Sequence, residues 1–597
     1  MSEILKRSQV DPKMTWDLTT IFKSDEAWEK ELDLITKDLE QITKYENTML
    51  DSKENIKTVL KLEEELGNRV ARIYTYAHLK SDEDTTNSKY QEYNSKAVAL
   101  YTDFETKTVF VSLSLLELTE EQVKEYFADP ELKIFEFFME KLIKSKEHVL
   151  SKKEEEIIAN MGHIMQTPSK TFSMLNNADI KFNDVVDSKG EVLPMNHSRY
   201  QVYMESNDRV LRENAYNSMY EAYKNLKNTF ATTLEGVVLN HMVTAKLKKY
   251  TSSRNAALTH NYIDEKVYDA LIHAVNDKLP LLHQYIELRK KLLKVDEIHM
   301  YDLHTNLVDN VDLKFTFEEA KEIILEAISV LGEEYVGIVK RAFDERWIDY
   351  AENEGKRSGA YSSGSYTTNP FILISWKGTI DNLFTLIHEL GHSLHSYYTR
   401  NFQPAVYGYY TIFLAEVASI TNEVLLSNYL MNKYKDNKEV KAYLLNNNLD
   451  SIRGTLFRQT QFAEFEYEMH KSLEEGKPLT ADYITKLYGE INEKYYGKSM
   501  TYDDNIPYEW TRIPHFYYNF YVYQYATGIS AAYAFAHRIL TMGEEAVELY
   551  KGYLKAGASK YPLDVLKEAG VDMSTNEPVY SCLAIFEENL KEFEKLI

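Results

Sequence analysis

Apolar residues recur at every third or fourth position through most of the chain, which is the spacing of amphipathic helices. Residues 25–46 and 55–84 show this repeat among many charged residues, and the repeat resumes near residue 206. Ser206 or Asn207 would cap the helix that begins there. We expect helices that keep one charged face in water, and we assign no function to those charges.

Two segments interrupt the helical repeat. In residues 178–195 the apolar period changes to two, and Ser-Lys-Gly separates Val186 from Val192, which predicts a β-hairpin. Residues 355–378 contain four of the 21 glycines, several serines and then the apolar run FILISW. This second segment predicts loops followed by a short buried or edge strand.

Length and composition limit the number of domains. The chain has 597 residues, 44% of them apolar, but only 21 Gly and 12 scattered Pro. Linkers are therefore scarce, and we expect long helices packed into one or two large units. We divide the chain into an N-terminal helical lobe that ends in the hairpin, residues 1–200, and a second domain with the candidate chemistry, residues 201–597.

Charge and cysteine content exclude several classes of function. The net charge of −24 repels phosphate backbones, so we expect no nucleic-acid partner. Cys582 is the only cysteine, which excludes an intrachain disulfide and a cysteine metal cluster. Because no apolar run is long enough for a signal peptide or a membrane span, we expect a cytoplasmic protein without a membrane partner.

The sequence HELGH at residues 388–392 lies in a predicted helix over residues 379–399. His388 and His392 are one turn apart, so both rings project from the same face. That spacing suits two nitrogen ligands on one zinc ion. Two surface histidines would need no metal, but the apolar flanks bury this helix, and buried histidines need partners.

Other residues of this helix give more detail. Thr379 or Asp381 can cap it. Glu389 can accept a proton from a water that the metal activates, without binding the metal. Gly391 costs about 1 kcal/mol relative to alanine inside a helix, so we expect a close neighbour there. His395, one turn beyond the pair, is expected to pack or to support a ligand.

A catalytic zinc site needs a third protein ligand. One known pattern has a histidine six residues after the second, but this chain has Tyr398 there. Residues 393–435 contain only two acids, Glu416 and Glu423, in a second apolar helix. With Ser419 they form one polar stripe, and buried carboxylates need partners.

We assign Glu416 as the third ligand. Glu423 is expected to accept a hydrogen bond from a ligand imidazole or to orient Glu416. The reverse order of the two glutamates is also possible.

Five tyrosines and one histidine lie within residues 515–525. A neutral tyrosine or histidine can donate a hydrogen bond to the oxyanion of a tetrahedral intermediate. Aromatic residues often only pack, however, and the chain has 46 tyrosines. The sequence alone leaves both interpretations open.

These motifs together resemble the oligopeptidase F family of zinc endopeptidases, which is related to thimet oligopeptidase. The likeness covers nearly the whole chain and includes WDLTTIF, SNDRVLRENAY, GKRSGAY, LIHELGHSLHSYY, AEVASITNE and PHFYYNFYVYQYATG. It implies a mainly α, multi-helical zincin-type fold in two halves around a deep channel, with a small β-sheet or hairpin element near the active site. It also implies that short unstructured peptides are the substrates.

The resemblance implies roles for individual residues. One zinc ion (Zn²⁺) per chain would be bound by His388, His392 and Glu416, and Glu389 would be the general base. The transition state would be stabilised by His515, Tyr518 and Tyr525, while Tyr521 and Tyr523 remain candidates for that role.

We therefore expect a zinc-dependent endopeptidase that acts on oligopeptides. The strand TNPFILISW is expected to bind the main chain of the substrate at a sheet edge. A metallocarboxypeptidase with the same site is the first alternative, and a non-catalytic helical peptide-binding scaffold is the second. The sequence does not predict the oligomeric state.

Overall fold

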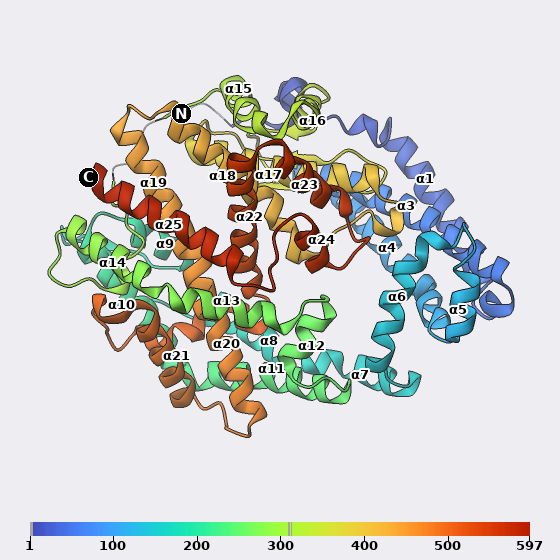
Figure 1. Ribbon diagram of the computed structural model, residues 1–597, viewed down its shortest axis with the longest axis horizontal. Coiled ribbons are helices and arrows are strands. Elements are labelled where there is room, and N and C mark those ends of the chain that lie inside the picture. Colours follow the sequence, from blue (N-terminus) through green and yellow to red (C-terminus); the bar gives the residue numbers. More distant parts are fainter. Residues whose placement is uncertain (1–3, 309–310, 312) are drawn as a thin grey trace. The chain divides into compact units, whose positions relative to one another are not determined.

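The computed structural model describes residues 4–308, 311 and 313–597, and most of them are helical (Figure 1). The chain forms two compact units, each built from three segments. Unit 1 comprises Met1–Lys146, Asp312–Tyr429 and Phe535–Val571, and unit 2 comprises Glu147–Val311, Leu430–Ala534 and Asp572–Ile597. The boundary that we placed near residue 200 lies inside unit 2, because helical periodicity reports local structure and not which distant segments pack together.

The helices and strands of unit 1 are α1 Asp25–Asp38, α2 Glu40–Thr43, α3 Lys53–Glu83, α4 Ser88–Leu115, α5 Glu120–Tyr126, α6 Glu136–Ser145, α15 Phe317–Ala327, α16 Glu333–Asp344, β3 Ile348–Asp349, β4 Tyr361–Ser363, β5 Phe371–Leu373, α17 Ile380–Phe402, α18 Ile412–Lys433, α23 Glu544–Ala556 and α24 Pro562–Glu568. The last four residues of α18 belong to unit 2.

The helices and strands of unit 2 are α7 Lys152–Met165, α8 Thr167–Met174, β1 Val185–Val186, β2 Val192–Leu193, α9 His197–Glu205, α10 Arg209–Asn225, α11 Lys227–Leu247, α12 Ser253–His260, α13 Glu265–Asp277, α14 Leu279–Leu293, α19 Lys438–Ile452, α20 Arg458–Glu474, α21 Ala481–Tyr496, α22 Tyr523–Met542 and α25 Glu577–Leu596. Helix α22 starts in unit 2 and ends in unit 1.

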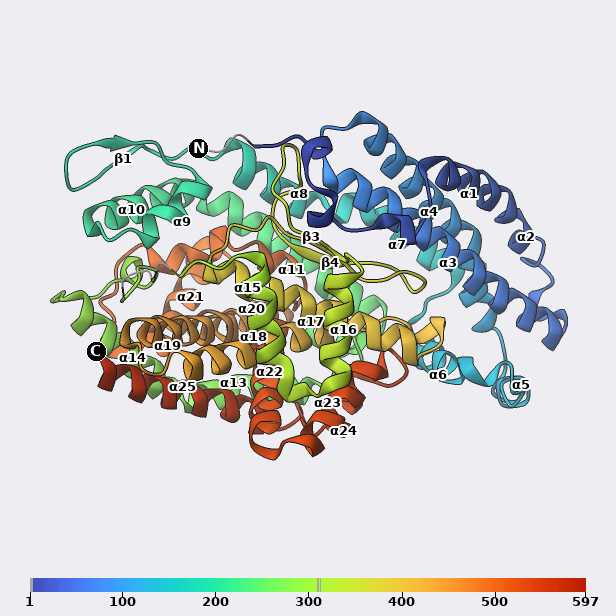
Figure 2. The same cartoon turned by 90° about the horizontal axis from the view of Figure 1, so that it is seen from above.

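The helical repeat near the N-terminus predicts these elements well. Residues 25–46 form α1 and α2, and residues 55–84 lie almost entirely in α3. Helices α1, α3 and α4 pack side by side (Figure 2), and a core that includes Trp28, Ile56 and Val70 lies between them. The charged residues of these helices alternate with this buried stripe, as an amphipathic helix requires.

Helix α10 begins one or two residues later than predicted, at Arg209. Its N-cap is Asp208, whose carboxylate accepts hydrogen bonds from the backbone N–H groups of Val210 and Leu211. The hydroxyl of Ser206 instead accepts from the N–H of Asp208. The prediction that Ser206 or Asn207 caps the helix was therefore wrong. Ser206 instead positions Asp208, the residue that caps it.

The predicted hairpin is present. Strands β1 and β2 pair antiparallel, with Val185 opposite Leu193 and Val186 opposite Val192. Gly190 in the turn has a φ of +84°, a conformation that glycine adopts without steric cost.

The Gly-rich segment forms two of the three strands of a second sheet, whose order is β3-β5-β4. Strand β5, from the run FILISW, is fully buried between a parallel neighbour, β3, and an antiparallel neighbour, β4. The prediction of a buried strand is confirmed, but its use as a substrate-binding edge strand was wrong. Since β5 pairs on both sides, β4 is the edge strand of this segment.

A buried lysine fixes the chain around this sheet. The ammonium of Lys356 donates to the carboxylate of Asp349 and to the carbonyl oxygens of Ala351 and Ile374. Asp349 also binds the guanidinium of Arg7. These contacts hold the ends of β3 and β5 together, and they fix where the chain enters the loop that leads to β4.

Among the described residues, no helix combines the length and apolar character that crossing a membrane requires.

Candidate metal centre and catalytic site

Helices α17 and α18 approach each other closely at Gly391. A Cβ atom at this position would lie 2.5 Å from the Cα of Ser419 and 2.8 Å from the carbonyl oxygen of Ala418. Both atoms belong to the backbone, so neither could move without shifting the helix. The predicted close neighbour of Gly391 is therefore α18, and the contact places the polar stripe of α18 beside the HELGH residues.

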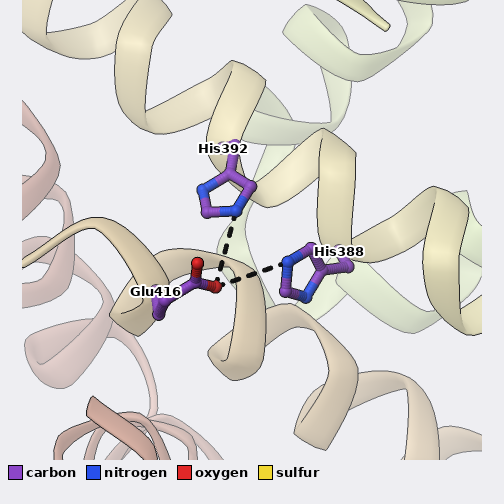
Figure 3. A group of neighbouring side chains, drawn as sticks. All are labelled: His388, His392 and Glu416. Carbon is purple, nitrogen blue, oxygen red and sulfur yellow. Dashed lines mark ion pairs between the residues drawn. The ribbon is translucent and has the colours of Figure 1, made fainter. Parts of the chain in front are cut away.

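Three side chains from the two helices converge at this contact (Figure 3). The Nε2 atoms of His388 and His392 lie 3.4 and 3.5 Å from Oε2 of Glu416. The potential ligand atoms of the three residues all lie within 4.8 Å of one another. Helix α17 is capped by Thr379, whose hydroxyl accepts a hydrogen bond from the N–H of Asn382, so one of the two predicted caps is confirmed.

These distances fit a metal ion. Two ligand atoms that each lie roughly 2.0–2.1 Å from a tetrahedral zinc ion are about 3.4 Å apart. Two imidazole nitrogens and one carboxylate oxygen are also a ligand set of catalytic zinc sites, which keep a fourth position open. The described residues therefore offer the geometry and the donor chemistry that a zinc ion needs.

Two neighbours orient these ligands. The Nδ1 atom of His388 lies 2.5 Å from Oε1 of Glu423, so the carboxylate accepts its hydrogen and directs Nε2 toward Glu416. The hydroxyl of Ser419 donates to Oε2 of Glu416 at 3.0 Å. The predicted stripe of Glu416, Ser419 and Glu423 therefore faces the two histidines, with Glu416 nearer to both Nε2 atoms.

The two carboxylates are less buried than we predicted. The side chains of Glu416 and Glu423 are 39% and 33% exposed. Their helix is buried through its apolar positions, but the polar stripe is accessible to water. A metal centre that must admit a substrate needs this partial access.

Local charges set the protonation of the histidines in the absence of metal. Burial lowers the pKa of His388, but the hydrogen bond to Glu423 and the nearby carboxylates outweigh it and leave that pKa raised. Burial lowers the pKa of His392 to about 4. A neutral imidazole is the form that binds a metal, so His392 needs no proton loss at neutral pH.

Glu389 projects beside the ligands but is much more buried, with 7% of the residue exposed. Burial raises its pKa to about 7, and the carboxylates of Glu416 and Glu423 add to the effect. The positive charge of His388 and a hydrogen bond from the backbone N–H of Ser362 oppose it. Glu389 is thus a carboxyl group that gains or loses a proton near neutral pH.

Ser362 connects the site to the sheet, and sequence reasoning missed it. Ser362 is the central residue of β4 and lies opposite Ile372, whose N–H bonds toward β3. In an antiparallel ladder the N–H and C=O of one residue point to the same side. The N–H of Ser362 therefore points away from β5, toward Glu389, and its carbonyl oxygen lies along the same open side of β4.

A second contact fixes β4 against α17. The hydroxyl groups of Ser362 and Ser393 lie 2.8 Å apart. The glycine and serine content of residues 355–378 signalled a loop, but only the pairing of β4 with β5 shows which serine lies beside Glu389.

His395 is a packing residue. Its ring is fully buried and stacks on Tyr410 with ring centres 3.7 Å apart and an interplanar angle of 6°. Tyr553 covers it with ring centres 4.8 Å apart. In the described structure no hydrogen bond joins the side chain of His395 to that of His388, His392 or Glu416, so the alternative role of supporting a ligand has no support there.

The aromatic segment of unit 2 forms a cluster around His515. The rings of Tyr518 and Tyr525 each lie 5.7 Å from the ring of His515, and that of Tyr521 lies 6.4 Å away. The hydroxyl of Tyr525 is 3.4 Å from Nε2 of His515. Tyr523, by contrast, is only 1% exposed and packs on Tyr268 in the core.

The accessible members of the cluster are therefore His515 and three tyrosines. Tyr518 is 55% exposed, and Tyr521 and Tyr525 are half-buried. Burial lowers the pKa of His515, so its ring is neutral at physiological pH. A neutral ring and three hydroxyl groups provide hydrogen-bond donors without a fixed charge.

Comparison with known proteins gives one consistent family. The family model described as Peptidase family M3 matches residues 202–585, and a model described as Oligopeptidase F matches residues 114–182. Oligopeptidase PepF of Bacillus subtilis is 47% identical over 100% of this chain and 89% of its own length. The oligoendopeptidase F homolog of Lactococcus lactis is 46% identical over 99% of this chain and 98% of its own.

Solved structures agree with these relatives. The structure of a peptidase from Chlamydophila abortus, described as putative, covers 100% of both chains with a TM-score of 0.94 and 37% identity. The oligoendopeptidase F of Enterococcus faecium covers 96% of this chain and 99% of its own, with a TM-score of 0.73 and 39% identity.

Proposed function

Because the chain belongs to peptidase family M3 and is a metalloendopeptidase of the oligopeptidase F type, we propose that it cleaves internal bonds of short peptides with one zinc ion. The ion would be held by His388, His392 and Glu416. The observation that carries this proposal is the convergence of three donor atoms from α17 and α18, with both histidine Nε2 atoms 3.4–3.5 Å from Oε2 of Glu416.

Zinc bound there supplies a Lewis acid that polarises the scissile carbonyl and makes water more acidic. Glu389 accepts a proton from the attacking water and returns it to the leaving amine. Burial raises the pKa of Glu389 in the metal-free protein, and this burial also keeps bulk water away from the group that accepts and returns the proton. The N–H of Ser362 holds this carboxylate beside the two histidines.

The substrate main chain pairs with β4 in this proposal. In the described structure no strand covers the side of β4 opposite β5, and the carbonyl of Ser362 lies on that side. An added peptide strand would form main-chain hydrogen bonds there, close to Glu389. Only an extended segment can form such bonds, which favours short unstructured peptides over folded proteins.

His515, Tyr518 and Tyr525 are the proposed donors to the oxyanion. Their support is the cluster of neutral donors in unit 2 and the resemblance of this segment to that of oligopeptidase F. Tyr521 remains an alternative because it shares the cluster, whereas the burial of Tyr523 argues against a role for it.

The endopeptidase activity is tested with two internally quenched peptides of the same sequence, one of which is blocked at both termini. We expect both to be cleaved at the same internal bond with kcat/KM values within about threefold of each other. A carboxypeptidase would leave the blocked peptide intact, and a peptide-binding scaffold would cleave neither. Cleavage sites are identified by mass spectrometry, and treatment with a chelator serves as the control.

We also propose a cytoplasmic location. The only cysteine, Cys582, is buried and unpaired, so the described fold uses no disulfide. That is usual for proteins of a reducing compartment.

A further inference from the structure

The aromatic segment passes through a strained backbone between its catalytic candidates. Asn519 and Phe520 have φ values of +46° and +57°, in the left-handed region that residues with a Cβ atom rarely occupy. His515 and Tyr518 precede this bend, and Tyr525 follows it. Such a conformation persists only where surrounding contacts hold it, so the contacts of the bend determine how these side chains are presented.

Phe520 is the residue that anchors the bend. Only 2% of it is exposed, and its ring packs on His470 and Tyr268 with ring centres 4.5 and 5.8 Å apart. Its backbone N–H donates a hydrogen bond to Oε1 of Glu466 at 2.7 Å. Ring packing alone would leave the N–H of Phe520 buried without an acceptor, so the Glu466 side chain from α20 completes the anchor.

Glu466 is an unusual residue for a protein core. It is fully buried, and its Oε2 atom has no hydrogen-bond partner among the described residues. Burial raises its pKa to about 8 against the lowering influence of the Phe520 N–H. Near neutral pH the side chain is therefore an uncharged carboxylic acid. Its Oε1 atom accepts the hydrogen bond from the N–H of Phe520, at the bend.

Among the described residues, no cation offsets the burial of this acid. His470, one turn further along α20, uses Nδ1 to bond the backbone carbonyl of Glu466, and its Nε2 lies 3.1 Å from Nδ1 of His241. Burial lowers the pKa of His470 to about 4, so it is neutral. An apolar residue would fill this position at a lower cost of desolvation. What Glu466 provides and an apolar residue would not is an oxygen that accepts the hydrogen bond of the Phe520 N–H.

We propose that Glu466 is a positioning residue, whose carboxyl group holds the Phe520 amide and thereby fixes the bend that presents His515, Tyr518 and Tyr525. This inference rests on the proposed function, in which those side chains contact the reacting peptide. Glu466 itself touches neither the substrate nor the metal in this account. It acts through the backbone of unit 2.

Two substitutions separate the acceptor from the volume of the side chain. Glu466→Gln keeps a carbonyl oxygen for the Phe520 N–H, and Glu466→Met has a similar length without an acceptor. Because both variants replace a buried acid by an uncharged side chain, we expect both to fold, and thermal unfolding checks this. Glu466→Leu is the substitute if the methionine variant does not fold.

Glu468→Gln is the matched control. It makes the same chemical change on α20, but two residues along a helix point to different sides.

Each variant is measured in two ways. The first is kcat and KM for the doubly blocked peptide, and the second is hydrogen exchange of the amides in residues 513–523. For Glu466→Met we expect kcat to fall about tenfold or more, KM to change by less than about threefold, and exchange of this segment to accelerate. For Glu466→Gln and Glu468→Gln we expect kcat within about threefold of the parent and slow exchange.

Three results would overturn the inference. The first is slow exchange in Glu466→Met, which would mean that the ring of Phe520 holds the bend alone. The second is an equal loss of kcat in the methionine and glutamine variants, which would mean that the acid has a role that an acceptor oxygen does not replace. The third is faster exchange with an unchanged kcat, which would mean that the bend does not matter for catalysis.

A separate measurement distinguishes failure of this inference from failure of the proposed roles of the cluster. His515→Gln and Tyr525→Phe are assayed on the same peptide. If both leave kcat unchanged, the proposed catalytic roles of His515 and Tyr525 fail, and the positioning role falls with them. If both lower kcat but Glu466→Met does not, only the inference about Glu466 fails.

Discussion

The Glu389→Gln variant is expected to bind one zinc ion per chain and to lose about 10³-fold or more in kcat. Glutamine has the shape of glutamate and its oxygen can still accept the N–H of Ser362, so the site keeps its geometry. The amide cannot take a proton from water, so the step that generates the nucleophile loses its base. Metal content by elemental analysis and kcat on the doubly blocked peptide check both parts of this expectation.

Asp381→Asn is the control for this experiment. It makes the same change from carboxylate to amide on α17, at an exposed position in the first turn. We expect kcat to stay within about twofold of the parent, with a small loss of stability from the weaker helix-dipole interaction. Comparable kcat in Glu389→Gln and the parent would refute the role of Glu389 as general base.

Glu416→Gln and Glu423→Gln are expected to differ strongly in zinc affinity. Glu416 lies within 3.5 Å of both Nε2 atoms, so its loss removes a ligand, and we expect affinity to fall by about 10³-fold or more. Glu423 contacts Nδ1 of His388, and the loss of such a partner costs about 10–100-fold. Competition with a chromophoric chelator measures both constants.

Activity at saturating zinc separates the same two variants. Excess zinc should restore most of the kcat of Glu423→Gln, because its three ligands are intact. It should not restore Glu416→Gln to the same extent, because the ion would be held by two histidines alone. The opposite order would show that the two glutamates have exchanged roles, which is the alternative that the sequence left open.

The parts of the site that the sequence predicts are those that depend on local spacing. One helical turn between His388 and His392 fixes their common face, and the stripe of Glu416, Ser419 and Glu423 follows from the same periodicity. Gly391 pointed to a close neighbour, which is the backbone of α18. The hairpin was predictable because its turn residues and alternating strands are adjacent in the chain.

The parts that were wrong or missed depend on contacts between distant segments. The run FILISW is apolar whether it lies at an edge or in the middle of a sheet, and only its pairing with β3 shows that it is central. For the same reason no local signal identified Ser362, whose position beside Glu389 depends on the pairing of β4 with β5.

Residues 515–525 have one feature that the sequence shows and others that only the packing of distant segments shows. Their aromatic content was visible in the sequence, but it did not distinguish buried from accessible tyrosines. The structure does so, because Tyr523 packs on Tyr268 whereas Tyr518 is 55% exposed. The bend at Phe520 and its contact with Glu466 had no sequence signal, since neither residue is typical of a left-handed backbone or of a buried anchor.

The central claim is that this chain hydrolyses internal peptide bonds with one zinc ion bound between α17 and α18. The most direct test is to remove the metal with a chelator, dialyse the chelator away, and return zinc in fractions of an equivalent while measuring cleavage of the doubly blocked peptide. The account predicts that the metal-free protein is inactive and that its activity rises linearly with zinc and stops rising at one equivalent per chain. Cleavage of the same peptide by the metal-free protein at the rate of the zinc-loaded protein would contradict it.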